Sequence, residues 1–186
     1  MEHVKYIALL RGVNVGGNHK LPMADLKTEV RRLGFANPET LLNSGNLVFE
    51  APLTDPALLE EQLSQHLQEV FGFPVPVLVR TGEEIMDLIR NNPFRDVTIT
   101  PDTRLYCSFL AVEPQESPKL PWISPDGAYR ILGIRDRTVC SVLDVGISDT
   151  TKSMDALEKI FGRNSTTRNY NTVQRMADKW LTKGAG

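Results

Sequence analysis

Short apolar runs and helix-period segments alternate along the first half of the chain. Residues 4–10 form a mostly apolar run that ends before Gly12, which is typical of a buried strand. Apolar residues then recur every three or four positions after Pro22 and again after Pro56, and each stretch predicts an amphipathic helix that opens with proline. The second helix is expected to end at Gly72. Its predicted inner face consists of Leu59, Leu63, Leu67 and Val70.

A hairpin and a returning strand complete this half. Apolar residues 40–42 and 47–49 flank Asn43-Ser44-Gly45-Asn46, and two such runs around a Ser-Gly turn predict a β-hairpin. Residues 74–80 return as a strand, and its flanking prolines place it at a sheet edge. The order β-α-β-β-α-β is that of the split βαβ, or ferredoxin-like, α-β plait. In that fold we expect two helices to cover one face of a four-stranded antiparallel sheet.

The second half predicts a further, less regular α+β unit. It opens with the capping box Thr81-Gly82-Glu83-Glu84 at a helix N-terminus. The elements expected after it are strands at residues 105–112, 128–134 and 138–143 and helices at residues 153–161 and from Asn171. We therefore expect an α+β fold with two ferredoxin-like domains built on antiparallel sheets, residues 1–80 and residues 81–186. No clear sequence repeat links the two halves.

The composition is that of a globular protein rather than a fibrous, disordered or membrane-embedded one. The chain has 186 residues, of which 41% are hydrophobic and 24% are charged, and its formal net charge is −2. No apolar stretch approaches the roughly 20 residues of a membrane span. The apolar run near Met1 is too short for the core of a signal peptide. These features predict a cytoplasmic protein with no membrane partner.

Residue spacing offers no metal, cofactor or catalytic motif. Cys107 and Cys140 lie far apart without a CxxC pattern, so packing roles are expected for both thiols. The histidines are scattered, and His19 is the one in a glycine-rich segment, where it is suited to acid–base chemistry. We expect neither a cofactor nor a metal ion.

The first candidate for ligand binding is the glycine-rich segment at residues 11–20. Its glycines let backbone N–H groups turn toward a ligand, and the helix that follows favours an anion at its N-terminus. Arg11, His19 and Lys20 add positive charge. The segment is neither a dinucleotide fingerprint nor a P-loop, because Asn18 and His19 stand where Lys and Ser or Thr are needed. A glycine-dependent connecting turn explains the pattern equally well.

Three further polar segments are candidates for ligand binding. A tight hairpin turn accounts fully for residues 43–46. All eight side chains of residues 165–172 can donate a hydrogen bond, and Arg168 before a helix N-terminus is suited to clamp a phosphate or carboxylate. Part of this segment has a structural use, since Asn171 or Thr172 can cap the last helix. Residues 146–153 also offer a Lys-Ser pair at a helix start as an anion contact.

Charge is distributed unevenly along the chain. Residues 152–183 contain seven basic and three acidic residues, whereas residues 50–79 contain five acidic residues and no Lys or Arg. A basic surface attracts phosphate-bearing partners, although solvated helix faces explain such a distribution as well.

Four ordered motifs give the chain a resemblance to a known family. They are Ala8–Gly17 followed by Lys20, Pro22 and Met23, then Asn43–Phe49, Asn92–Phe94 and Thr166–Thr172. In these motifs the chain resembles the uncharacterised bacterial family described as domain of unknown function 1697. It departs from the family's most familiar forms by Val13 for Ile, Asn43 for Gln and Tyr170 for Trp. The resemblance implies two α+β sandwich domains of ferredoxin-like type and no established activity or catalytic residues.

The sequence predicts a protein that binds an anionic ligand at polar, glycine-rich loops near the domain junction. The ligand is expected to be a nucleotide, a phosphorylated metabolite or a nucleic-acid backbone. The predicted contacts are Arg11, Asn14, Lys20, Ser44, Asn46, Arg168 and Asn171. Two alternatives stay open: an enzyme acting on a phosphorylated small molecule with His19 as proton carrier, and a protein-interaction module that pairs through the edge strand at residues 75–80.

Overall fold

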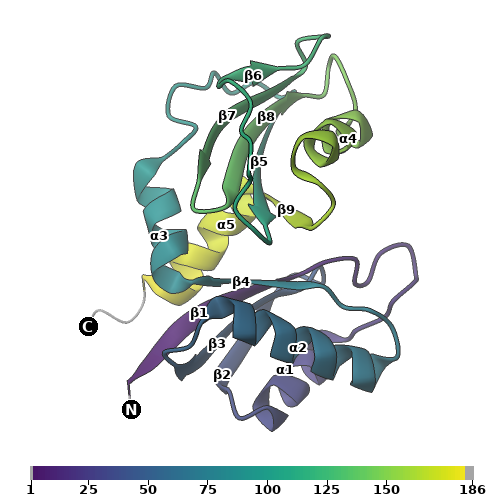
Figure 1. Cartoon of the computed structure of the whole chain (residues 1–186), viewed down its shortest axis with the longest axis vertical. Helices are drawn as coiled ribbons and strands as arrows, with labels where there is room; N and C mark the ends of the chain where they lie inside the picture. Colours follow the sequence, from purple (N-terminus) through teal and green to yellow (C-terminus); the bar gives the residue numbers. More distant parts are fainter. Residues whose placement is uncertain (1, 183–186) are drawn as a thin grey trace. The chain divides into compact units, whose positions relative to one another are not determined.

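The computed structural model describes residues 2–182, which form two compact units (Figure 1). The first unit comprises residues 2–86 and 176–182, and the second comprises Asp87–Arg175. The N-terminal strand and the C-terminal helical turn therefore belong to the same unit. The predicted division into residues 1–80 and 81–186 as separate domains stays a prediction.

The first unit follows the predicted β-α-β-β-α-β order. Its elements are β1 (His3–Leu10), α1 (Met23–Arg32), β2 (Ala36–Leu41), β3 (Asn46–Pro52), α2 (Pro56–Phe71) and β4 (Val77–Thr81). The strands form an antiparallel sheet in the order β2-β3-β1-β4, so that β1 is central and β4 lies at an edge, as predicted.

One face of this sheet carries the hydrophobic core of the unit. Alternate β1 residues, including Tyr6 and Ala8, pack against apolar residues of α1 and α2, and both helices lie on the same side of the sheet (Figure 1). The predicted inner face of α2 is confirmed at Leu59, Leu63 and Leu67 and is wrong at Val70, which is 45% exposed. The apolar stripe continues four residues after Leu67 at Phe71, which packs against the core and leaves Val70 facing solvent.

The predicted capping box is confirmed at the start of α3 (Gly82–Asn91). The backbone N–H of Thr81 donates to Glu84 Oε2 at 2.8 Å, and the N–H of Glu84 donates to Thr81 Oγ1 at 3.1 Å. Each residue thus satisfies a backbone donor that the first helical turn leaves unpaired.

The second unit contains a five-stranded antiparallel sheet in the order β6-β7-β8-β5-β9. Its elements are β5 (Thr103–Leu110), β6 (Trp122–Ile123), β7 (Tyr129–Arg135), β8 (Thr138–Asp144), α4 (Thr150–Phe161), β9 (Ser165–Asn169) and α5 (Tyr170–Met176). A π-helical turn, η1 (Ala177–Leu181), continues the chain into the first unit. The α+β class with antiparallel sheets is confirmed.

Some elements of the second unit depart from the sequence prediction. The predicted strands include neither β6 nor β9, although Thr166 and Thr167 of β9 are β-branched residues that suit a strand. Helix α4 begins three residues before its predicted start, because the side chain of Asp149 accepts the N–H of Lys152 and caps the helix there.

The second unit repeats the strand connections of the first. In both units the first strand lies between the second strand of the hairpin and the strand that follows the next helix: β1 between β3 and β4, and β5 between β8 and β9. Helix α4 takes the place of α2, whereas no helix connects β5 to β7. The two halves of the chain are therefore alike in topology without a recognisable sequence repeat.

Within residues 2–182, every helix is too short or too polar to span a bilayer.

Replacing Thr81 with Ala removes the hydroxyl that accepts the N–H of Glu84 at the start of α3. We expect the free energy of unfolding to fall by about 1 kcal/mol, the usual cost of losing a helix N-cap, as measured by urea denaturation with circular dichroism. Thr28→Ala is the matched control, because Thr28 lies exposed inside α1, where Ala is the better helix former. An equal loss in the two variants would contradict the capping role.

Candidate functional site

Two of the three predicted ligand-binding segments meet in the first unit, and Asn14 joins them. The side-chain Nδ2 of Asn14 donates to the carbonyl oxygen of Asn43 at 2.7 Å and to that of Leu21 at 2.9 Å. Its Oδ1 accepts the backbone N–H of Leu21 at 2.8 Å. The glycine-rich loop is therefore closed upon itself and fastened to the β2–β3 turn. Asn14, predicted to contact a ligand, uses its amide within the protein.

Gly45 brings the β2–β3 turn directly against the beginning of the loop. Its carbonyl oxygen accepts the N–H of Leu10 at 2.9 Å, and its φ is +89°. A Cβ at this position would lie 2.6 Å from Leu10 Cβ and 3.1 Å from Val13 Cγ2. Only glycine fits this contact, so the turn and the loop are held in close register.

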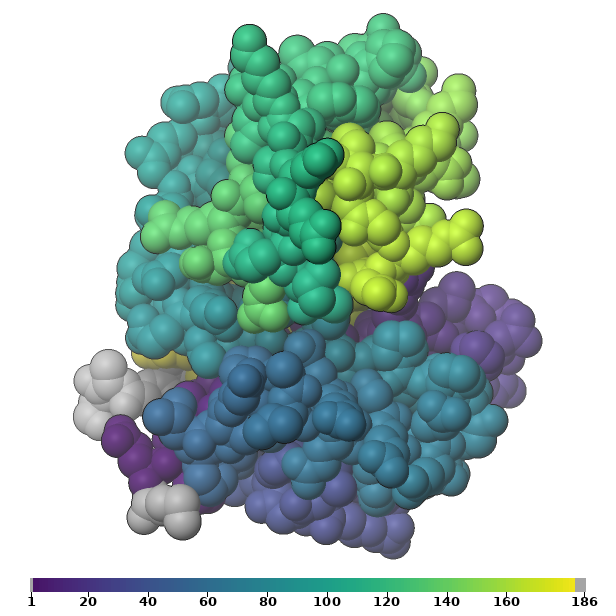
Figure 2. All heavy atoms as spheres, viewed as in Figure 1, coloured from purple at the N-terminus to yellow at the C-terminus, as the bar shows by residue number. Residues whose placement is uncertain are grey.

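The outer part of the loop presents backbone donors and a lysine to solvent. Gly16 and Gly17 have positive φ values and lie exposed, between the bridged residues Val15 and Asn18. Among the described residues, neither glycine N–H donates a hydrogen bond to another backbone group. Lys20 is exposed three residues further on. Figures 1 and 2 show this loop in purple at the right-hand edge of the first unit.

The other predicted contacts in this unit differ in accessibility. Ser44 is exposed in the turn, and its Oγ accepts Asn46 Nδ2 at 3.2 Å. Asn46 is fully buried, and its Nδ2 also donates to the carbonyl oxygen of Leu41 at 2.9 Å, so its amide holds the turn instead of facing solvent. Arg11 is half-buried, and its backbone N–H donates to the carbonyl oxygen of Pro76 at 3.0 Å.

His19 stands at the end of the loop in a fixed orientation. Its ring stacks on that of Phe73, with centroids 4.5 Å apart and planes 6° from parallel. Its φ of +50° is uncommon for a residue other than glycine. The stack fills one face of the imidazole and contributes to the shape of the loop.

The third predicted segment belongs to the second unit. Arg168 lies in β9 at 8% exposure, and its Nη1 donates to Thr166 Oγ1 at 2.7 Å and to the carbonyl oxygen of Thr167 at 3.1 Å. Burial lowers the pKa of Arg168 to about 10, so the guanidinium remains charged at neutral pH. Asn171 is exposed in α5, which begins at Tyr170, one residue before the predicted start. Convergence of all three segments near a domain junction stays a prediction.

The segment at residues 146–153 does not have the electrostatics of an anion site. The carboxylate of Asp149 already occupies the N-terminus of α4 by accepting the N–H of Lys152 at 3.0 Å. Ser153 is buried and donates its hydroxyl to the carbonyl oxygen of Thr150 at 2.7 Å. A negative charge at the helix start repels a second anion, and the serine faces inward.

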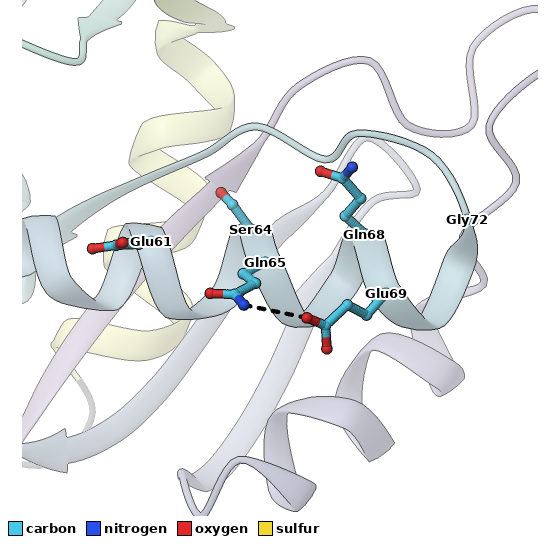
Figure 3. Close-up of a pocket in the computed structure, with 6 residues that line it drawn as sticks. All are labelled: Glu61, Ser64, Gln65, Gln68, Glu69 and Gly72. Carbon is cyan, nitrogen blue, oxygen red and sulfur yellow. Dashed lines mark hydrogen bonds between the residues drawn. The ribbon is translucent and has the colours of Figure 1, made fainter.

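A shallow hollow along α2 carries the wrong charge for the predicted ligand (Figure 3). Its lining residues are Glu61, Ser64, Gln65, Gln68, Glu69 and Gly72. Gln65 Nε2 donates to Glu69 Oε1 at 3.2 Å, and the two carboxylates make the surface acidic. An anion is therefore disfavoured here, in agreement with the acidic composition of residues 50–79.

A small cavity of about 260 Å³ in the first unit was not evident from the sequence. Its lining residues are Lys5, Asn37, Glu39, Val48, Glu50, Lys179 and Trp180. Trp180 Nε1 donates to Glu39 Oε2 at 2.9 Å, and Lys5 Nζ donates to the carbonyl oxygen of Trp180 at 2.8 Å. These polar groups satisfy one another and fasten η1 to the sheet. Among the described residues, no cluster of His, Cys, Asp and Glu side chains could hold a metal ion.

Replacing Asn14 with Ala removes all three hydrogen bonds that join the loop to Leu21 and Asn43. We expect the free energy of unfolding to fall by about 2 kcal/mol, because partly buried backbone groups lose their partners. Asn18→Ala is the matched control, since Asn18 is exposed in the same loop. Urea denaturation should separate the two variants. Equal stability of Asn14→Ala and Asn18→Ala would show that the loop does not depend on Asn14.

Comparisons with known proteins agree with the resemblance noted in the sequence. The family model described as "Protein of unknown function (DUF1697)" matches residues 4–128. No curated protein matches the chain. The solved structure of the conserved bacterial protein SP0830 from Streptococcus pneumoniae is similar, with a TM-score of 0.72 and 22% sequence identity, over 95% of this chain and 98% of that one. At this identity the likeness shows a shared fold. Because the family model covers most of the sequence, the chain belongs to the DUF1697 family of proteins of unknown function.

Proposed function

We propose that the loop at residues 11–20 and the β2–β3 turn form a binding site for a phosphate-bearing anion. The proposed ligand is a nucleotide, a phosphorylated metabolite or a nucleic-acid backbone. The observation that carries the proposal is the Asn14 clamp, which fastens a loop with exposed glycine N–H groups and an exposed lysine to a neighbouring polar turn. A loop that merely connects β1 to α1 needs no such link to a separate hairpin.

The charge of this surface supports an anion. Residues 11–23 contain Arg11 and Lys20 and no acidic residue. The N–H groups of Gly16 and Gly17 lack neighbouring side chains on their own residues, so a phosphate oxygen can approach them closely. Backbone donors combined with a lysine ammonium are a common way to bind phosphate.

The proposal assigns different roles to the predicted residues. Arg11, Lys20 and Ser44 are the side chains proposed to contact the ligand. Asn14 and Asn46 hold the loop and the turn in position through their hydrogen bonds. Arg168 and Asn171 of the second unit stay predictions, and we leave them out of this site because the Arg168 side chain is buried.

The alternative of strand pairing at β4 finds less support. β4 lies at the sheet edge, as that alternative requires. However, the carbonyl oxygen of Val79 accepts Arg80 Nη1 at 3.1 Å, and the N–H of Thr81 donates to Glu84. The chain's own side chains thus use part of the edge that a partner strand would need.

We also propose that the two units are ferredoxin-like. For the first unit this assignment is supported by the element order and by the strand order β2-β3-β1-β4. The second unit keeps the corresponding strand order but lacks the first of the two helices. A cytoplasmic location likewise stays a prediction.

Replacing Lys20 with Ala tests the site. A thermal-shift screen of wild-type protein against nucleotides, phosphorylated metabolites and short RNA and DNA identifies a ligand, and isothermal titration then measures its affinity. We expect Lys20→Ala to weaken binding about five- to tenfold, since one charge-assisted hydrogen bond is lost. Lys119→Ala, which removes an exposed lysine from another loop, should leave the affinity unchanged. Absence of any ligand in the screen, or equal affinities for the two variants, would overturn the proposal.

A further inference from the structure

The two cysteines, distant in sequence, face each other in the sheet of the second unit. The antiparallel register of β5 and β8 places Cys107 directly opposite Cys140. Both are free thiols, with exposures of 0% and 3%. No local motif indicates this pairing, because it arises from the register of two strands that are distant in sequence.

The hydrogen bonds on either side show which kind of cross-strand pair this is. The N–H of Leu110 donates to the carbonyl oxygen of Arg137 at 2.8 Å. At the other end of the strand pair, the N–H of Val145 donates to the carbonyl oxygen of Asp102 at 2.9 Å. Hydrogen-bonded and non-hydrogen-bonded pairs alternate along an antiparallel ladder. Counting from either bond, Cys107 and Cys140 occupy a non-hydrogen-bonded pair.

This position has the backbone separation that a disulfide needs. In non-hydrogen-bonded pairs the Cα atoms lie about 4.5 Å apart and the side chains approach more closely than in the other kind of pair. Disulfides span Cα separations of roughly 4.4–6.8 Å. The strands therefore need not move apart or slip for the two sulfurs to bond.

The surroundings favour the dithiol until an oxidant is supplied. The hydrogen bond that the Cys107 thiol donates to Cys140, together with burial, raises the pKa of Cys107 well above its ordinary value, so Cys107 stays protonated at neutral pH. Burial, and then the two cysteines, raise the pKa of Tyr170. The Tyr170 ring contacts that of Phe94, with centroids 4.7 Å apart. Thiolate is therefore scarce in the folded state, and an oxidant reaches the pair when the sheet opens locally and exposes the thiols.

We propose that Cys107 and Cys140 are a redox modification site that forms a reversible disulfide within the chain when a hydroperoxide reacts with it. One cysteine sulfur attacks the peroxide, the O–O bond breaks, the thiol proton passes to the departing alkoxide or hydroxide, and a sulfenic acid forms. The sulfur of the other cysteine then displaces the hydroxyl group, which leaves as water with the second thiol proton. The sulfur pair loses two electrons, and the peroxide gains them.

The bond would join two strands that already pair, so its effect is on stability and not on the fold. It would fix β5 to β8 in the unfolded chain as well, which restricts the unfolded state of the second unit. The same restriction applies to the whole segment between these strands, including β6 and β7. This inference is independent of the proposed anion site, which lies in the first unit.

Peptide mass spectrometry of the wild-type protein after mild peroxide treatment tests the proposal. We expect a linked peptide pair containing Cys107 and Cys140, lighter than the two free peptides by the mass of two hydrogen atoms, and recovery of both thiols after dithiothreitol. Oxidation should also raise the Tm of the treated protein by about 5–10 °C, and reduction should reverse the rise.

Single variants provide the matched controls. Cys107→Ala and Cys140→Ala should each lose both the linked peptide and the oxidant-dependent rise in Tm. If either variant fails to fold, the result on wild-type protein still decides. Wild-type thiols that remain alkylatable after peroxide and denaturation would overturn the proposal. Recovery of the disulfide only between two chains, or of irreversibly oxidised single cysteines, would overturn it equally.

Discussion

Burial of the interior strands β1 and β5 on both faces of their sheets is the constraint on which both units depend. In β1, Tyr6, Ile7, Ala8, Leu9 and Leu10 are all buried, and β5 shows the same unbroken burial from Tyr106 to Leu110. A strand with water on one side would alternate between apolar and polar residues, but here both sets of side chains leave solvent. Polar residues within such a strand must find partners inside the protein, as Ser108 does with Thr167 Oγ1 at 2.8 Å.

Because the interior strands are buried on both faces, exposed polar groups lie in the loops at the ends of these strands. The chain leaves β1 at Arg11 and immediately enters a loop with positive φ at Gly12, Asn14, Gly16, Gly17 and His19. Such backbone cannot pair in a sheet, and it exposes N–H groups that the strand would otherwise use. The rigidity of the loop comes from one amide side chain and one close glycine contact, both directed at the hairpin next to β1. An exposed loop held in this way is better prepared for a ligand than a mobile one.

Sequence patterns predicted the first unit well because its elements carry strong local signals. The Thr81–Glu84 capping box, the α2 stripe through Leu67 and the hairpin at Ser44-Gly45 each depend on residues within a few positions of one another. The errors have a common physical origin in contacts between distant segments. β9 has a polar sequence but pairs with the distant strand β5. The Asn14–Asn43 hydrogen bond joins two separate loops, and Cys107 meets Cys140 through strand register alone. The predicted ligand contacts divide in the same way: exposure of Lys20 follows from its loop, whereas burial of Asn46 and Arg168 does not follow from sequence.

Because the turn η1 belongs to the first unit, that unit is synthesised first but gains its last contacts only after the second unit has been synthesised. Trp180 Nε1 donates to Glu39 and the Trp180 carbonyl oxygen accepts Lys5 Nζ, so the sheet of the first unit binds a residue that is synthesised after the whole second unit. During translation the first unit must wait, with its β1–β2–β3 surface lacking this contact, until the second unit has been made. The nascent chain is therefore exposed to aggregation and to chaperones for longer than the length of its first unit alone implies.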